Sequence, residues 1–382
     1  MIFRILEDQF AQKARDSKEA DRRYMQLALA LGRRGQGRTW PNPAVGAVIV
    51  KDGIIVGRGW TQPGGRPHAE PEALWRAGEA ACGATLYVTL EPCSHFGKSP
   101  PCADAVIAAG IKRVVAAIED PNPDVAGQGH ARLRAAGITV DVGLCAAEAA
   151  FDHAGHFRRI RDRRPHVILK LAVSPDGKIG GAGGTPVAIT GEAARNRVHL
   201  LRAQSDAILV GIGTVLADDP VLTCRLPGMA ARSPVRVVLD QSLRIPGDSR
   251  LVHSARETPL WVVCSELAEA AAAARLGAAG AQVMRMPPTS ASGLDLPVVL
   301  HELSEKGITR LMVEGGSRVA ASFVAADLVD EIWLFRGAEE VGRDGVDALD
   351  ALPLSKITQS QSFKVHASET FDRDTLTIYE RA

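Results

Sequence analysis

Apolar residues in the first part of the chain form short runs with strand and helix periodicities. The runs Ala44–Val50 and Ile54–Trp60 are separated by Lys51-Asp52-Gly53, and Asp-Gly between two such runs is a strong hairpin signal. An amphipathic helix is predicted to begin at Asp21 and to end at the glycines that follow residue 34. Residues 1–20 are predicted to form a polar N-terminal extension.

Strand and helix patterns then alternate along the chain. Strands are predicted at Thr85–Leu90 and Lys112–Ile118, and helices are predicted to begin near His68 and at Ala103. This alternation predicts a three-layer α/β sandwich. A second, different α/β unit follows Pro165, because the alternation restarts there. Its predicted strands are His166–Val173, Ala207–Val210, Val235–Leu239, Leu260–Val263, Arg310–Val313 and Glu331–Phe335.

The boundary between these two units is predicted between Ala150 and Pro165. Five arginines stand in the seven positions 158–164. The simplest interpretation of this basic run is a solvated linker or helix end, and a phosphate-binding patch is the alternative. We therefore assign residues 21–160 to the first domain and residues 161–382 to the second.

Charge and composition narrow the class of protein. The chain of 382 residues carries 45 Lys and Arg against 44 Asp and Glu, so its net charge of +1 offers no field for nucleic acid or an acidic membrane. No apolar run is long enough to cross a bilayer, and the N-terminus lacks the apolar stretch of a signal peptide. Six irregularly spaced cysteines indicate a reducing cytoplasm, where clustered cysteines are more often metal ligands.

One His, one Glu and two Cys form the pattern that carries chemistry. His68-Ala69-Glu70 precedes Cys93 by 25 residues, counted from His68, and Cys102 follows nine residues after Cys93. This is the signature of zinc-dependent deaminases. Three protein ligands leave a fourth position for water, whose pKa the metal lowers to about 7. Glu70 would not ligate the metal but would carry the proton from the water to the substrate.

Other interpretations of these residues remain open. A His-x-Glu sequence by itself is more often a surface feature than a site. Two cysteines nine apart could be free thiols, or part of a structural zinc site that would need a fourth ligand, for which His95 is the nearest candidate. The remaining cysteines are most simply buried small residues, namely Cys82, Cys145, Cys224 and Cys264.

The segment between the two cysteines identifies a family. Together with Pro41–Gly46 and His68-Ala69-Glu70, the eight-residue insert Ser94–Pro101 resembles the bifunctional deaminase–reductase family of riboflavin biosynthesis. The resemblance implies a cytidine-deaminase-like first domain that hydrolytically deaminates 2,5-diamino-6-ribosylamino-4(3H)-pyrimidinone 5′-phosphate. It also implies that Asn42 binds the pyrimidine and that His95 and Lys98 line the entrance. Lys98 would contact phosphate, although a solvated loop lysine is an equal alternative.

The second half of the chain carries glycines directly after two predicted strands. Gly211-Ile212-Gly213-Thr214 follows one strand, and Glu314-Gly315-Gly316-Ser317 follows another. Glycine at the carboxyl end of a strand lets a phosphate approach backbone N–H groups. A single Gly-x-Gly is weak evidence, because tight strand-to-helix turns need glycine anyway, and neither stretch is a full dinucleotide fingerprint.

The family resemblance extends over this half and implies its function. The matching motifs are Lys170-Leu171-Ala172, Ser174–Gly177, Val215–Pro220 and Glu314–Gly316. They resemble the reductase half of the family, whose fold is similar to dihydrofolate reductase and which uses NADPH to reduce the ribosyl group to a ribityl chain. The implied cofactor contacts are Ala172, Ala188, Thr214, Asp218, Gly316 and Ser317. The implied substrate contacts are Pro186, Arg202, Leu222, Arg225 and Glu314.

One segment departs from the family pattern. Relatives commonly have Ser-x-Trp-Ile-Thr before the first helix of the reductase domain, whereas this chain has Pro186-Val187-Ala188-Ile189-Thr190. The serine contact to the substrate and the aromatic wall beside the cofactor are both missing. We therefore expect NADPH to bind more weakly here than in relatives that keep the tryptophan.

The prediction is a cytoplasmic, two-domain α/β enzyme that uses zinc and NADPH on a small pyrimidine ribosyl phosphate. We expect a homo-oligomer that engages neither nucleic acid nor membrane. The first alternative is a deaminase whose degenerate second half serves assembly. A nucleic-acid base deaminase is disfavoured by the near-zero charge and by aromatic residues at only 4%. A non-enzymatic zinc-binding module would need four protein ligands.

Overall fold

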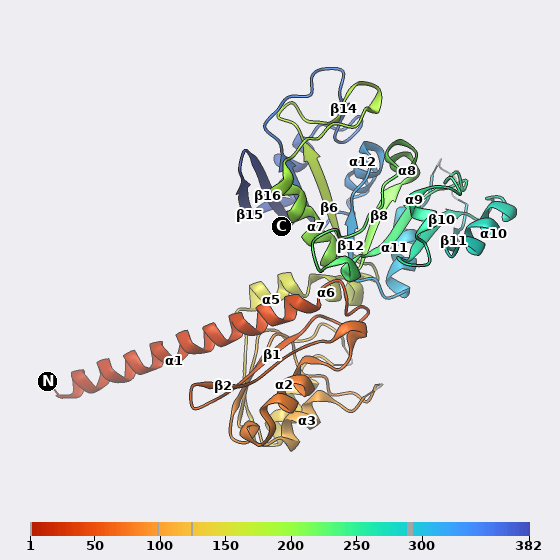
Figure 1. Cartoon of the computed structure of the whole chain (residues 1–382). Coiled ribbons are helices and arrows are strands. Elements are labelled where there is room, and N and C mark those ends of the chain that lie inside the picture. Colours follow the sequence, from red (N-terminus) through yellow and green to blue (C-terminus); the bar gives the residue numbers. More distant parts are fainter. Residues whose placement is uncertain (1, 98, 124, 289–292) are drawn as a thin grey trace. The chain divides into compact units, whose positions relative to one another are not determined.

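The chain folds into two compact units, Met1–Asp162 and Arg163–Ala382 (Figure 1). The structure is a computed structural model that describes residues 2–97, 99–123, 125–288 and 293–382. The boundary predicted after residue 160 falls within the last turn of helix α6 (Ala154–Asp162). Within the described residues, no helix has both the length and the apolar character that crossing a bilayer demands.

The first unit is built on a five-stranded sheet with the strand order β2-β1-β3-β4-β5. Strands β1 (Gly46–Lys51) and β2 (Ile54–Trp60) form the predicted hairpin. Its two turn residues, Asp52 and Gly53, have φ values of 52° and 78°. A two-residue turn with both φ values positive matches the twist of antiparallel strands, and this is why Asp-Gly is favoured there.

Both faces of this sheet are covered by helices, which confirms the predicted three-layer sandwich. Alternate residues of β1 enter different cores: Ala47 and Ile49 pack with helices α2 and α3, whereas Val48 and Val50 pack with α1 and α5. Successive strand side chains point to opposite faces, so a strand that is apolar throughout must be buried on both. The remaining elements are α2 Ala69–Ala77, β3 Thr85–Val88, α3 Cys102–Ala108, β4 Arg113–Ala116, α4 Gln128–Ala135, β5 Thr139–Val142 and α5 Ala146–Asp152.

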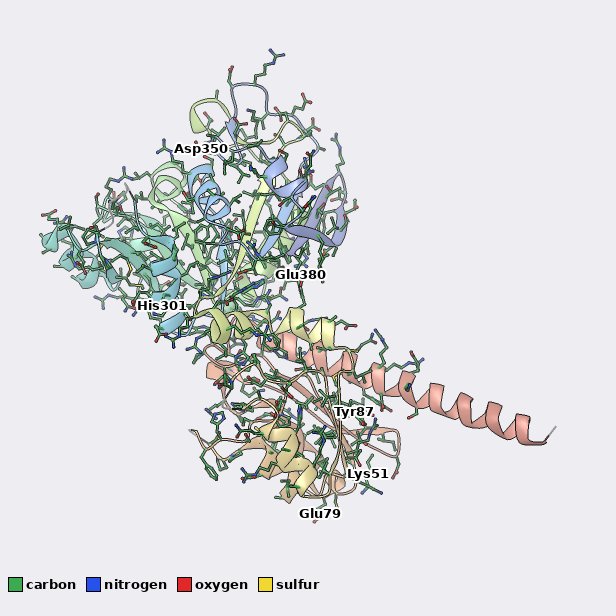
Figure 2. The ribbon with its side chains drawn as sticks, turned by 180° about the vertical axis from the view of Figure 1, so that it is seen from behind. Lys51, Glu79, Tyr87, His301, Asp350 and Glu380 are labelled. Atoms are coloured by element: carbon green, nitrogen blue, oxygen red, sulfur yellow. The ribbon has the colours of Figure 1, made fainter. Side chains whose placement is uncertain are left out.

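The first helix differs from its prediction. Helix α1 spans Ile2–Gly32, so the predicted start at Asp21 is wrong. The preceding residues contain neither Pro nor Gly and are rich in good helix formers, which lets the helix extend toward the N-terminus. Asp21 instead anchors the helix: it pairs with Arg113 at 2.8 Å and accepts a hydrogen bond from the hydroxyl of Tyr87. Tyr87 is labelled in Figure 2.

The basic run between the units is engaged in contacts within the protein. Arg158 pairs with Asp162 at 2.5 Å, and the Arg161 guanidinium lies 5.2 Å from the centre of the Phe157 ring. Arg164 forms two hydrogen bonds to Asp330 at 2.6 and 2.8 Å. These contacts favour the interpretation of the basic run as a helix end rather than as a phosphate-binding patch.

The second unit is built on a nine-stranded sheet with the order β11-β10-β9-β8-β12-β6-β13-β16-β15 (Figure 1). All neighbouring pairs are parallel except those made by β16. The strands of this sheet are β6 His166–Val173, β8 Ala207–Gly211, β9 Val235–Leu239, β10 Leu260–Ser265, β11 Gln282–Met286, β12 Arg310–Val313, β13 Glu331–Arg336, β15 Phe363–Phe371 and β16 Asp374–Arg381. A separate two-stranded antiparallel sheet pairs β7 Lys178–Gly180 with β14 Val346–Asp347. The helices of this unit are α7 Glu192–Ala203, α8 Ile212–Asp218, α9 Arg250–His253, α10 Ala270–Ala279, α11 Leu296–Glu305, α12 Ser317–Ala325 and α13 Ser355–Thr358.

The strand order of this sheet reverses between β8 and β12. From β8 the chain proceeds outward through β9, β10 and β11, and it then returns to β12 on the other side of β8. In open α/β sheets, ligands bind outside the carboxyl ends of the strands at such a switch point. The two glycine-bearing stretches noted in the sequence follow these two strands, so the topology places them at that crevice.

Candidate functional site

The N-terminus of α2 places His68 and Glu70 at one end of the first sheet. His68 is the N-cap residue, with an extended backbone, and Glu70 lies in the first turn. The helix packs tightly on β2, because a Cβ at Gly57 or Gly59 would lie only 2.3 or 2.2 Å from a backbone oxygen of α2. This close approach of backbones fixes the height of the helix end above the sheet.

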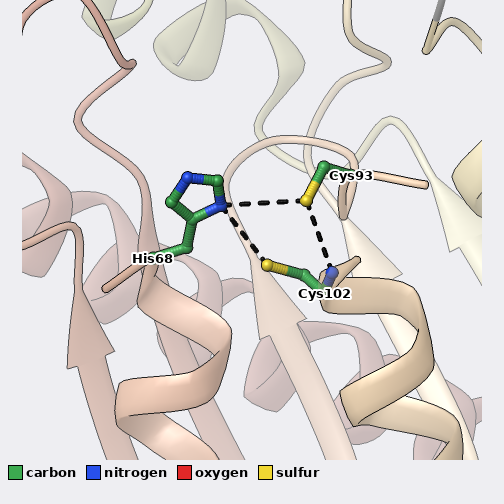
Figure 3. Close-up of side chains that lie close together, drawn as sticks. All are labelled: His68, Cys93 and Cys102. Carbon is green, nitrogen blue, oxygen red and sulfur yellow. Dashed lines mark hydrogen bonds between the residues drawn. The ribbon is translucent and has the colours of Figure 1, made fainter. Parts of the chain in front are cut away.

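The two cysteines reach His68 from the next strand-to-helix connection. Cys102 is the first residue of α3, and Cys93 lies in the loop after β3. The His68 Nδ1 atom lies 3.3 Å from Cys102 Sγ and 3.8 Å from Cys93 Sγ (Figure 3). The Cys102 N–H donates a hydrogen bond to Cys93 Sγ at 3.3 Å, so the start of α3 directs a backbone donor at that sulfur.

The geometry of these three side chains fits a zinc ion. Their ligand atoms all lie within 4.8 Å of one another. In a tetrahedral zinc site a sulfur and a nitrogen ligand stand roughly 3.5 Å apart, given bond lengths of about 2.3 and 2.0–2.1 Å. The two observed distances from His68 Nδ1 lie on either side of that value. His95, the candidate fourth ligand of a structural site, is exposed and does not belong to this group.

The electrostatics of the two thiols also indicate a cation site. Hydrogen bonds from Cys102 and His68 lower the pKa of Cys93 to about 4. The neighbouring Cys93 sulfur, together with burial, raises the pKa of Cys102. Two thiolates so close together repel each other, so without a cation only one of them ionises readily. A divalent metal removes that penalty, which is why this donor set suits zinc.

Glu70 lies beside the cluster and is nearly inaccessible to solvent, with 3% of its surface exposed. Its Oε2 atom is buried and has no hydrogen-bond partner among the residues that the structure describes. Burial raises the pKa of Glu70 to about 7. A carboxyl group that exchanges its proton near neutral pH suits general acid–base catalysis.

The sequence analysis gave Glu91 no role, and the structure gives it one. Its carboxylate accepts four backbone N–H groups at 2.8–3.3 Å, including those of Gly127 and Gly129 at the start of α4. These bonds tie α4 to the Glu91-Pro92-Cys93 stretch and so position the first cysteine. Glu91 also lies near Glu119 and His130 in a second group of metal-ligand type, but its oxygens are already occupied by the backbone.

Of the residues predicted to contact the substrate in the first unit, Asn42 is hydrogen-bonded within the protein and His95 is exposed. Asn42 donates a hydrogen bond from Nδ2 to the Gly65 carbonyl at 3.0 Å, which places it beside the turn that leads to His68. His95 is exposed in the loop between the cysteines. Lys98 lies outside the described residues. The same loop is held by Arg66, which donates to the Ser99 hydroxyl.

In the second unit, the two glycine-bearing turns meet as the topology requires. The Gly316 N–H at the start of α12 donates to the Thr214 hydroxyl of α8 at 3.0 Å. Thr214 and Asp218 are four residues apart on α8 and therefore share a helix face. Ser317 is the first residue of α12. Two helix N-termini thus converge where β8 and β12 end, an arrangement that suits an anionic ligand.

A carboxylate and two cations form a charged cluster in this unit. Glu314 follows β12 and pairs with Lys170 of β6 at 3.2 Å and with Arg202 of α7 at 2.9 Å. Burial alone would raise the pKa of Glu314, but Arg202 and Lys170 outweigh it and lower the pKa to about 2. Lys170 was noted in the sequence only as part of a motif, and no spacing along the chain predicts its pairing with Glu314.

The other predicted residues of the second unit are placed around the same sheet edge. Ala172 lies near the carboxyl end of β6, and Pro186 and Ala188 are exposed in the segment after β7. That segment reaches the end of β13, since a Cβ at Gly337 would lie 1.9 Å from the Ile189 carbonyl oxygen.

Two further predicted residues follow α8. Leu222 is buried, and the side chain of Arg225 is exposed. Of the predicted reductase residues, Arg202 with Glu314 and Thr214 with Gly316 are in direct contact.

Comparison with protein families gives one match for each unit. Residues 18–118 match the cytidine and deoxycytidylate deaminase zinc-binding region. Residues 165–377 match the RibD C-terminal domain. The first match covers the His68, Cys93 and Cys102 cluster, and the second covers the cluster around Glu314. The match to the RibD C-terminal domain favours a working reductase over the deaminase-only alternative.

Relatives with the same two-part organisation match nearly the whole chain. The riboflavin biosynthesis protein RibD of Aquifex aeolicus is 42% identical over 364 residues, which cover 95% of this chain and 99% of that protein. The solved structure of Acinetobacter baumannii RibD has a TM-score of 0.84 at 35% identity and covers 96% of this chain and 99% of its own.

A solved structure from Thermotoga maritima is described as a diaminohydroxyphosphoribosylaminopyrimidine deaminase and 5-amino-6-(5-phosphoribosylamino)uracil reductase. It has a TM-score of 0.83 at 36% identity, covering 96% of this chain and all of that one. The predicted fold, the bifunctional activity and the cofactors zinc and NADPH are thereby confirmed. The chain belongs to the RibD family, the bifunctional deaminase–reductases of riboflavin biosynthesis.

Proposed function

We propose that the first unit deaminates 2,5-diamino-6-ribosylamino-4(3H)-pyrimidinone 5′-phosphate and that the second unit reduces the product. The observation that carries this proposal is the cluster of His68, Cys93 and Cys102 with the buried, non-ligating Glu70 beside it. Three protein ligands and a separate carboxyl group are what hydrolytic deamination requires. Water adds to C2 of the pyrimidine, the bond from C2 to the exocyclic amine breaks, a carbonyl group forms at C2 and ammonia is released.

Within this site each residue has a distinct task. His68, Cys93 and Cys102 would hold the zinc ion, which would supply a water molecule of lowered pKa near neutral pH. Glu70 takes a proton from the attacking water, delivers it to the ring nitrogen and then protonates the departing amine. This role is supported by the Glu70 Oε2 atom, which forms no hydrogen bond with any described residue and is therefore available to the substrate. Asn42 orients the pyrimidine.

The second unit binds NADPH at the switch point of its sheet. The residues proposed to contact the cofactor are Ala172, Ala188, Thr214, Asp218, Gly316 and Ser317. The hydrogen bond between Gly316 and Thr214, together with the two helix N-termini, supports a site for the phosphates of the cofactor. NADPH supplies the hydride that, with one proton, converts the ring-closed ribosyl group into an open ribityl chain.

The substrate of this reduction is proposed to lie over Glu314 and the segment that contains Leu222 and Arg225. Lys170 and Arg202 keep Glu314 ionised, so that it can accept hydrogen bonds from the hydroxyl groups of the sugar. The guanidinium of Arg225 is exposed and can bind the phosphate. Pro186 stands where relatives offer a serine, so we expect one substrate contact fewer.

The experiment that tests this assignment measures the two steps separately. Purified wild-type enzyme with zinc should release ammonia from the diaminopyrimidine phosphate and should oxidise NADPH with the deaminated intermediate. Cys102→Ser should lose zinc and ammonia release and should keep NADPH oxidation. Cys82→Ser is the matched control, because Cys82 is exposed and lies outside the cluster. Loss of both activities in a folded Cys102→Ser protein, or ammonia release without zinc, contradicts the assignment.

The cytoplasmic location, the homo-oligomer and the absence of a nucleic-acid or membrane partner stay predictions from the sequence. They rest on the near-neutral charge, the cysteine usage and the low aromatic content. The action on a small-molecule substrate agrees with the family of the chain.

A further inference from the structure

The segment Val221–Arg225 has no regular secondary structure, yet its carbonyl groups are held by side chains from distant elements. The Val221 carbonyl accepts a hydrogen bond from Nη1 of the buried Arg236 at 3.4 Å. The Thr223 carbonyl accepts one from Nη1 of Arg202 at 3.1 Å. Cations on β9 and α7 therefore define the path of this loop from two sides.

The backbone N–H groups of the same segment are also engaged by side chains. The Cys224 N–H donates to the Ser233 hydroxyl at 3.1 Å. The Arg225 N–H donates to Nδ1 of His199, on α7, at 3.4 Å. Four backbone groups in five residues are thus satisfied by side chains rather than by a strand or helix. Such a loop is pre-shaped by its surroundings, since each of these bonds would otherwise go to water.

The loop also holds a backbone conformation that its sequence does not favour. Leu222 has a φ of 57°, in the left-handed region, and its side chain is buried in the core of the unit. A branched, bulky residue adopts this conformation only where the surrounding contacts over-determine it, and such positions cluster at ligand sites. This left-handed residue lies three positions before Arg225.

His199 is suited to act as a fixed acceptor for this loop. It is 8% exposed, and burial lowers its pKa, with Arg202 and Arg225 acting in the same direction. The ring is therefore neutral at pH 7, and Nδ1 carries a lone pair for the Arg225 N–H. Glu314 and the hydrogen bond with the Thr223 backbone raise the pKa of His199, but the net shift of that pKa is downward.

The two arginines near this loop differ in what they can offer a ligand. Arg202 already donates to Glu314 through Nε and to the Thr223 carbonyl through Nη1. The side chain of Arg225 is exposed. Arg225 is thus the better placed of the two to grip a phosphate, and its direction depends on the backbone that His199 holds.

We propose that His199 is a positioning residue for the phosphate of the reductase substrate: by accepting the Arg225 N–H, it fixes the loop from which the Arg225 guanidinium reaches that phosphate. This inference rests on the proposed role of Arg225. According to this inference, a pre-shaped loop held by α7 recognises the phosphorylated sugar. Disturbing the loop should therefore weaken binding of the phosphorylated substrate and leave binding of the dephosphorylated substrate unchanged.

The test compares reduction of the deaminated intermediate with reduction of its dephosphorylated form. His199→Leu keeps the bulk of the side chain and removes the acceptor, whereas His199→Asn keeps an acceptor near the position of Nδ1. We expect His199→Leu to raise KM for the phosphorylated substrate about tenfold with kcat changed by less than about twofold, because one buried N–H loses its partner. KM for the dephosphorylated substrate should stay the same, and His199→Asn should recover most of the affinity.

Further measurements separate failure of this inference from failure of the proposed function. Ser233→Ala removes the neighbouring bond to the Cys224 N–H and should reproduce a smaller, phosphate-specific rise in KM, even if His199→Leu fails to fold. An equal rise of KM for both substrates, or no rise, overturns the positioning role. If Arg225→Ala raises KM for the phosphorylated substrate while His199→Leu and Ser233→Ala do not, only this inference fails. If Arg225→Ala has no effect, the assignment of Arg225 fails as well.

Discussion

At the scale of single residues, Glu70 combines a position beside the zinc ligands with almost complete burial. Its neighbour in sequence, His68, contributes a ligand atom to the cluster, whereas Glu70 contributes none. A group that is held close to the metal but does not bind it can accept and return a proton. The division of tasks between two residues only two positions apart follows from the N-cap position of His68, which turns its side chain away from the helix.

Replacing Glu70 tests this division directly. We expect Glu70→Gln to retain zinc, because Gln keeps the shape and no ligand is lost, and to lower the rate of ammonia release by about 10²–10⁴-fold. Metal content by elemental analysis and ammonia release by a coupled assay measure the two properties. Glu79→Gln, at an exposed carboxylate of the same unit, is the control. Deamination near the wild-type rate would remove Glu70 from the mechanism.

Glu314 is a residue of the second unit whose ionisation stabilises the fold. Its pKa is lowered from 4.5 to about 2, so its contribution is fully present above its ordinary pKa and is lost as the pH falls toward 2. A shift of about 2.5 units corresponds to at most roughly 3 kcal/mol at neutral pH. Glu314→Gln should therefore lower the thermal stability of this unit at pH 7, and the difference from wild type should shrink as the pH falls from 5 to 2.

Thermal unfolding followed from pH 7 to pH 2.5 measures this difference. The exposed carboxylate Glu340 supplies the control, since Glu340→Gln should leave the profile unchanged. If the unfolding temperatures of wild type and Glu314→Gln differ by the same amount at every pH, ionisation of Glu314 does not stabilise the unit.

At the scale of elements, the sequence predicted those whose pattern is local. The hairpin follows from Asp52-Gly53, and the strands β6, β9 and β12 have the predicted bounds, because continuous apolar runs between turns mark buried parallel strands. The start of α1 was missed, because charged residues are interspersed among the apolar ones at positions 1–20 and mask their pattern. The C-terminal hairpin of β15 and β16 was also missed, although the alternating burial of β16 matches an alternation in its sequence.

The ligands of the candidate zinc site were predictable from sequence, because short fixed spacings bring them to two neighbouring helix starts. The supporting contacts were not. Lys170 meets Glu314 across 144 positions of the chain, and His199 meets Arg225 across 26. Such pairs depend on strand order and helix packing, which cannot be predicted from a local sequence pattern. Glu91 had a local signal, its place directly before Pro92-Cys93, but its backbone partners lie in the loop after β4, at Asp120, and at the start of α4.

The packing of α4 against the cysteine loop gives a prediction at this scale. A Cβ at Gly129 would lie 2.0 Å from the Pro92 carbonyl oxygen, so Gly129→Ala must displace either α4 or the loop that carries Cys93. We expect a loss of about 1–3 kcal/mol in the stability of the first unit and a zinc affinity lower by about 10–100-fold. Chelator competition measures the affinity.

A control separates this clash from the general effect of replacing a glycine. Gly277 lies in α10, and its added methyl group would meet nothing within 4 Å. Gly277→Ala should leave zinc affinity unchanged. Unaltered zinc affinity in Gly129→Ala would mean that the loop holds Cys93 without help from α4.

At the scale of the whole molecule, each of the two chemistries is contained in one unit. All residues of the zinc cluster and Glu70 lie within Met1–Asp162, and the reductase residues lie within Arg163–Ala382. Both candidate sites use helix starts that follow strand ends. In the first unit a helix start turns a backbone donor toward a cysteine sulfur, and in the second the Gly316 N–H donates to the Thr214 hydroxyl. The same structural device thus recurs in both candidate sites.

The central claim is that the first unit holds a catalytic zinc ion with three protein ligands and one position open to solvent. X-ray absorption at the zinc edge of the full-length enzyme tests it most directly, because it separates sulfur ligands from nitrogen and oxygen ligands and recognises imidazole. We expect two sulfur ligands, one imidazole ligand and one further light-atom ligand that exchanges with solvent. A spectrum with four protein ligands and no exchangeable oxygen would contradict it and would indicate a structural zinc site.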